Sequence, residues 1–124
     1  MSTMKLEKGE LHPYFDAVSR TLLRGKRTRI EVAAIPLGDQ IEVEWLLLIG
    51  VVYDCGSDVL HVLVEGHVDH MIGRPLEVYI DAGAAGLQSM LVVAGDGTRH
   101  IVQFRDPLML PATVGAWLSR GHDS

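Results

Sequence analysis

The chain has 124 residues, of which 48% are hydrophobic, and a formal net charge of −5. This length fits a single domain, and the apolar content is sufficient for a core without disulfides or a structural metal. The acidic balance argues against nucleic acid and anionic membrane surfaces as partners. The single Cys55 excludes an intramolecular disulfide. Without a signal-peptide pattern or an apolar run long enough for a membrane helix, we expect a cytoplasmic protein.

The N-terminal part of the chain predicts one helix. Residues 1–8 have no periodic pattern, and we expect a loose terminus there. Apolar residues then recur at helical spacing from Glu10 to Leu23, and Pro13 suits the first turn of a helix. The opposite face of the predicted helix is polar, with Asp16, Ser19 and Arg20.

A basic cluster follows the predicted helix. It comprises Arg20, Arg24, Lys26, Arg27 and Arg29. The simpler interpretation is a solvated flank between a helix and a strand. A nucleic-acid footprint is the alternative, but such a footprint usually needs a whole basic face of a domain.

Beyond residue 25 the pattern changes to the alternation of strands. The predicted strands, about six in number, are residues 28–34, 41–53, 59–64, 76–80, 90–93 and 98–104. The segment 41–53 alternates throughout, so we expect Trp45 and the other odd-numbered residues to face the core. Gly50 allows a bend in its middle. For residues 113–120 we expect a short helix.

These elements together predict an α+β fold. Because the connections are short, neighbouring strands must run antiparallel. We expect the N-terminal helix to cover a strongly curved, mostly antiparallel sheet of about six strands, partly closed into a small barrel like the Sm and SH3-like barrels. The whole chain, 1–124, then forms one domain with a loose terminus (1–8), a core (9–108) and a C-terminal tail (109–124).

Several segments resemble one bacterial family, catalogued as domain of unknown function 5335. They are Phe15–Arg20, Leu48–Asp54 with Asp58–Leu60, His67–Ile72 with Arg74-Pro75, and Asp96–Thr98 with Gln103–Arg105. The resemblance runs from about residue 10 to residue 108. The chain departs from the family in its more basic link, 24–29, and in its tail after Pro111. The family has no established activity, so the resemblance implies identity and supplies no catalytic residue.

The polar insert Gly66–Pro75 contains the candidate site. In a helical turn, His67 and His70 would share one face, and Asp69 could orient them or join them as a metal ligand. A zinc site needs three or four protein ligands, and nothing in the sequence fixes the missing ones. The other interpretation is a structural polar turn whose histidines bond to the backbone. We therefore predict no metal and no cofactor, and we take His67, Asp69, His70 and Arg74 as candidate ligand-binding residues.

The function that we expect is a non-catalytic binding or assembly module that forms a homodimer. The alternative is an enzyme or metal-binding protein centred on His67, Asp69 and His70. One helix cannot cover both faces of such a sheet, so apolar residues should be left exposed and mark the interface between subunits. The candidate patches are Leu46, Leu48 and Val52, or Val114, Trp117 and Leu118. A buried Trp45 further predicts a loss of about 3–5 kcal/mol on Trp45→Ala.

Overall fold

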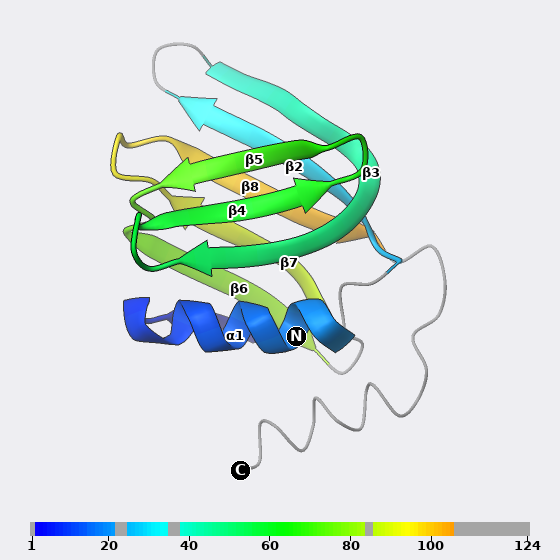
Figure 1. The fold of residues 1–124 in the computed structure, drawn as a ribbon. Coiled ribbons are helices and arrows are strands. Elements are labelled where there is room, and N and C mark those ends of the chain that lie inside the picture. Colours follow the sequence, from blue (N-terminus) through cyan, green and yellow to red (C-terminus); the bar gives the residue numbers. More distant parts are fainter. Residues whose placement is uncertain (1, 22–24, 35–37, 84–85, 106–124) are drawn as a thin grey trace.

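The computed structural model describes residues 2–21, 25–34, 38–83 and 86–105 (Figure 1). These residues form helix α1 (Lys8–Thr21) and eight strands. The strands are β1 (Ser2–Leu6), β2 (Arg27–Ala34), β3 (Gly38–Asp54), β4 (Val59–Val64), β5 (Val68–Gly73), β6 (Glu77–Gly83), β7 (Gly86–Val93) and β8 (Arg99–Arg105). The predicted helix at 113–120 and the patch at Val114, Trp117 and Leu118 lie outside the described residues. Within them, no helix is long and apolar enough to cross a membrane.

All eight strands belong to one sheet in the order β1-β6-β7-β8-β2-β3-β4-β5, and every pairing is antiparallel. The long strand β3 pairs with β2 through its first part and with β4 through its second. It curves between the two, so that its second part, β4 and β5 form a layer in front of the other strands (Figure 1). The sheet stays open, with β1 and β5 at its edges. Our prediction of about six strands in a partly closed barrel is therefore wrong, although the predicted helix and antiparallel sheet are present.

The two strands that the sequence did not predict are the two edges of the sheet. We expected β1 to be a loose terminus and β5 to be a polar turn. In β1, Leu6 is buried and residues 3–5 are exposed; in β5, Ile72 is buried and most of the other side chains are exposed. An edge strand has one neighbour and can remain largely solvated, so it need not show the apolar alternation that reveals a central strand.

Strand β3 contains three irregularities that change which residues face the core. Its register with β2 shifts twice, near Glu42 and near Trp45, and its register with β4 shifts once, near Ile49. Each extra residue moves the buried set by one position, because side chains alternate between the two faces of a strand. The residues of β3 that pack into or against the core are Val43, Leu46, Leu48, Val51 and Tyr53.

Trp45 is consequently not a core residue. It is half-buried and has a left-handed backbone with φ of 55°. Simple alternation also placed Ile49 in the core, but its side chain is 62% exposed. The expected loss of about 3–5 kcal/mol on Trp45→Ala, which assumed full burial, no longer applies.

Helix α1 covers one side of the core by packing on β3. Leu11, Phe15 and Val18 are buried at helical spacing. Ser19, which we placed on the polar face, instead bonds to β3: its hydroxyl donates to Val51 O and accepts from Val51 N–H, both at 2.9 Å. Beyond Leu47, β3 no longer has β2 beside it. Ser19 thus takes the place of a neighbouring strand at Val51.

Candidate functional site at strand β5

The candidate residues lie on the β4–β5 hairpin. β4 and β5 pair without irregularity from Val59↔Gly73 to Val64↔Val68. The loop between them, Glu65–His67, has left-handed backbone at Gly66 (φ 85°) and at His67 (φ 60°). The segment is therefore an edge hairpin in place of the irregular turn that we expected.

Because β5 is extended, the candidate residues do not share one face as they would in a helical turn. Asp69 and His70 are adjacent in β5, so they point to opposite faces. His67 is exposed in the loop, and Arg74 lies past the other end of the strand. Arg74 covers the β7–β8 turn so closely that a Cβ added at Gly95 would be 2.5 Å from Arg74 Nε. Within the described ranges, no three His, Cys, Asp or Glu residues are grouped so that they could hold a metal ion.

Asp69 instead pairs with a histidine on the neighbouring strand. His61 Nδ1 lies 2.9 Å and 3.1 Å from the two carboxylate oxygens of Asp69. The two side chains are 24% and 37% exposed, respectively. The carboxylate can orient the imidazole by accepting the Nδ1 proton, which leaves Nε2 as the acceptor. Sequence reasoning did not pair His61 with Asp69, because that pairing depends on the β4–β5 register.

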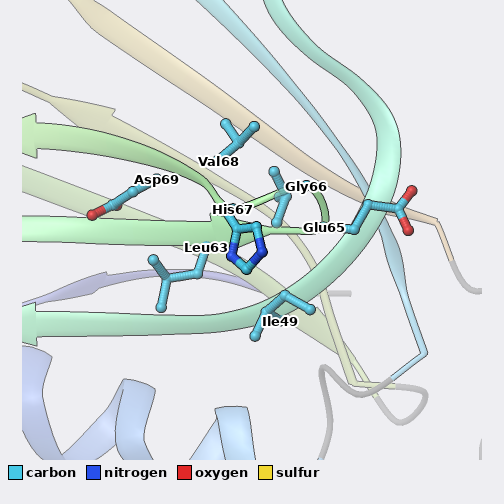
Figure 2. Close-up of a pocket in the computed structure, with 8 residues that line it drawn as sticks. Ile49, Leu63, Glu65, Gly66, His67, Val68 and Asp69 are labelled. Atoms are coloured by element: carbon cyan, nitrogen blue, oxygen red, sulfur yellow. The ribbon is translucent and has the colours of Figure 1, made fainter.

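The face that carries this pair is apolar and lined with shallow cavities. We call it the outer face of β3–β4–β5; its most exposed apolar side chains are Ile49 (62%), Met71 (61%) and Val52 (47%). A cavity of about 460 Å³ lies at the loop end of the hairpin, where His67 is beside Leu63 and Ile49 (Figure 2). A second cavity, of about 500 Å³, shares Leu63 and Asp69 with it. Val52 belongs to a patch that we expected to be exposed, whereas Leu48 is buried and Leu46 packs against the core.

On the inner face, His70 bridges the two layers. Its Nε2 lies 2.9 Å from Nδ1 of His100 on β8, and His100 Nε2 lies 2.9 Å from the hydroxyl oxygen of Thr98. The Thr98 hydroxyl donates in turn to Asp96 Oδ1 at 2.6 Å. Because that hydroxyl proton points to Asp96, His100 must donate from Nε2 and accept at Nδ1, so His70 donates from Nε2. The chain of hydrogen bonds thus requires a neutral His100 and is compatible with a neutral His70.

Burial reinforces the neutral state of both rings. It lowers the pKa of His100 to about 4, with a smaller contribution from the nearby His70. Burial also lowers the pKa of His70, against the opposing charges of Glu42 and Asp69. At neutral pH the bridge is therefore an uncharged link between β5 and β8. Sequence reasoning could not find it, because His70 and His100 are thirty positions apart.

Among the residues that the structure describes, the backbone of β5 has one neighbouring strand, so part of its hydrogen-bonding groups face the open edge of the sheet. Arg74 N–H donates to Asp58 O at 2.8 Å, in the same register as the strand pair. In an antiparallel ladder alternate residues bond to one neighbour. Even-numbered residues of β5 therefore bond to β4, and Asp69, Met71 and Gly73 direct their backbone groups to the open side. Gly73 O already accepts from Gly95 N–H at 3.3 Å.

Comparison with known proteins agrees with the resemblance seen in the sequence. The model of a family of unknown function, DUF5335, matches residues 2–113. An uncharacterized protein of Aquifex aeolicus (strain VF5) is 32% identical over 111 residues, which cover 90% of this chain and 99% of that protein. No solved structure matches the chain significantly.

Proposed function

The chain belongs to the family of unknown function DUF5335, and we propose that this member is a non-catalytic assembly module that forms a homodimer through the free edge of β5. The observation that carries the proposal is the row of backbone groups at Asp69 and Met71 that have no strand partner among the described residues, on a regular, mostly exposed edge strand. Such an edge is a template for another strand. The proposal includes a cytosolic location, which the free and exposed Cys55 supports.

A second copy of the chain is the occupant that fits this edge. Two β5 strands related by a two-fold axis run antiparallel, and odd-numbered residues must face odd-numbered residues for their backbone groups to bond. Centring the axis on Asp69 would place two carboxylates opposite each other. Centring it on Met71 would use Gly73, whose carbonyl already bonds to Gly95. Centring it on His70 places Asp69 opposite Met71 of the second copy and forms about four hydrogen bonds.

This arrangement also uses the outer face. A two-fold axis perpendicular to the sheet turns both outer faces to the same side, so the apolar side chains of the two copies become neighbours. Met71, 61% exposed, would then lose most contact with water against the β5 of its partner. Hydrogen bonds alone, at about 1 kcal/mol net each, would not offset the entropy of association, so this burial has to contribute.

The edge strand β1 provides a comparison within the same sheet. It is shorter than β5, and Lys5, next to its buried Leu6, is exposed. A lysine on an edge is a common device against pairing with another chain. β5 contains neither lysine nor proline and has no bulge. This difference favours β5 as the edge that accepts the second copy.

Sedimentation equilibrium of the full chain at micromolar concentration tests the dimer. We expect twice the chain mass of 13.6 kDa. Met71→Glu should weaken the dimer, because the new carboxylate of each copy would lie opposite Asp69 of the other copy. Met71→Lys should preserve it, because the new cation faces Asp69 of the second copy. Met4→Glu, the same change at an exposed methionine on β1, is the matched control and should have no effect.

Two outcomes would overturn the proposal. A mass near 13.6 kDa for the unaltered chain would exclude the dimer at that concentration. A dimer that Met71→Glu and Met71→Lys affect equally would place the interface away from this register of β5.

A further inference from the structure

A cavity lies on the other layer of the sheet, between β7, β8, the residue that precedes β2 and the middle of β3. Its volume is about 530 Å³. Its lining includes two cationic residues, Lys26 and Arg105, the Trp45 side chain, and the polar residues Gln88, Ser89 and Gln103. We propose that this cavity binds a small anion that carries a carboxylate or phosphate group, with Arg105 and Trp45 as its main contacts.

The first argument is the conformation of Trp45. It has a φ of 55° inside a strand, at one of the irregularities of the β2–β3 pairing. A large residue in the left-handed region costs about 1–3 kcal/mol and persists only where its surroundings hold it there. Bulges in strands often turn a side chain toward a site in this way. The bulge and the left-handed backbone together direct Trp45 to the cavity and away from the core.

The second argument is that two arginines hold Trp45 from different sides. Arg27 donates from Nη1 to the Trp45 carbonyl oxygen at 3.3 Å, which fixes the backbone. The guanidinium carbon of Arg105 lies 4.8 Å from the centre of the indole ring, which fixes the side chain. A stacked guanidinium keeps its N–H groups at its rim, where they can donate to an oxyanion. These two contacts fix both the backbone and the ring of Trp45 beside the cavity.

The third argument is the balance of charge. Arg29 lies 3.1 Å from Glu31, and Arg27 lies 3.6 Å from Glu65, so each has a carboxylate nearby. Arg105 has no carboxylate within ion-pair distance in the part of the chain that the structure describes. Within those residues, its guanidinium faces the Trp45 ring instead of a carboxylate.

The polar lining adds donors beside this charge. Gln103 Oε1 accepts from Arg29 at 3.2 Å, so its amide nitrogen is left to donate. Lys26, the other cation of the lining, is 3% exposed. The basic cluster that we noted in the sequence at Lys26, Arg27 and Arg29 therefore contributes to this region through its contacts. Arg105 joins it from β8 because Arg27 and Arg105 are partners in the β2–β8 register.

Fluorescence of Trp45 measures binding directly. The chain has two tryptophans, so the titration uses full-length Trp117→Phe, in which Trp45 is the only one. Inorganic phosphate and citrate are added separately, and sodium chloride at matched ionic strength is the blank. We expect a saturable change with at least one of the two anions and none with chloride. The anion that saturates identifies phosphate or carboxylate as the preferred group.

Variants of Arg105 distinguish a specific site from general charge. Arg105→Gln should weaken binding about tenfold, the loss expected for one charge-assisted hydrogen bond. Arg99→Gln removes the same charge at the opposite end of β8 and should leave the affinity unchanged. Isothermal titration calorimetry repeats the comparison without depending on the fluorescence of a ring that Arg105 itself covers. Equal affinities of the two variants, or no saturation with either anion, would overturn the proposal.

Discussion

Removing the Ser19 hydroxyl should destabilise the protein far more than a half-buried serine on a helix would ordinarily suggest. Ser19→Ala leaves both the N–H and the C=O of Val51 without the partner that the hydroxyl provides at 2.9 Å. The Val51 side chain is fully buried. An unsatisfied buried group costs about 1–3 kcal/mol, and partial access of water beside Ser19 reduces the sum for the two groups. We expect a loss of about 2 kcal/mol in the free energy of unfolding.

Urea unfolding followed by circular dichroism measures this loss, with Ser57→Ala as the control. The Ser57 hydroxyl also makes a hydrogen bond, to Asp54 Oδ2 at 2.9 Å, but in an exposed loop. Its removal should change stability by less than about 0.5 kcal/mol. Faster hydrogen exchange of the Val51 amide in Ser19→Ala would place the effect at β3. Similar losses in the two variants would refute the idea that Ser19 substitutes for a strand.

Three further predictions concern the core, the bulge and the bridge between the layers. Phe15→Ala, which empties a fully buried position, should lower the free energy of unfolding by about 3–5 kcal/mol in the same urea assay. Trp45→Gly should lower the free energy of unfolding by only about 1 kcal/mol, because relief of the left-handed strain offsets part of the lost contact with Arg105. A loss above about 3 kcal/mol would mean that Trp45 is a core residue. Since the pKa of His100 is about 4 in the native state and 6.5 ordinarily, its contribution to stability should be complete above pH 6.5 and should fall by about 3 kcal/mol on acidification to pH 4. Urea unfolding from pH 7 to pH 4 measures this fall, and an equal fall in His100→Phe would contradict its assignment to His100.

The central strands could be predicted from the sequence because burial on one face dictates their composition. β4 and β8 appear within a residue or two of their predicted limits. β3 was also found, but its residues were assigned to the wrong faces at Trp45 and Ile49. Alternation is a local rule, whereas an irregularity depends on how a strand must curve to pair with two different neighbours. The position of a bulge therefore depends on how the whole sheet pairs, which the sequence of one strand does not show.

The candidate site shows the same limit: the residues of a segment can be read from the sequence, but their partners on other strands cannot. The polar, histidine-bearing composition of Gly66–Pro75 was the reason for choosing this segment as the candidate site. Its conformation was predicted wrongly, since His67 and His70 suggested a helical turn where β5 is extended. The partners of Asp69 and His70 come from β4 and β8, and only the register of the sheet identifies them. The role of these residues as a ligand site stays a prediction.

The order of the strands also constrains when each pairing can form. Most neighbours in the sheet are joined by short hairpins, which gives two local meanders, β2 to β5 and β6 to β8. The exceptions are β2–β8 and β1–β6, whose register joins Arg27 to Arg105 and Ser2 to Ala82. Such distant contacts carry the loop-closure entropy that slows folding. During synthesis β1 emerges before β2 to β8, yet its pairing cannot form until the chain has been made through β6, so β1 has to wait for a strand that lies far along the chain.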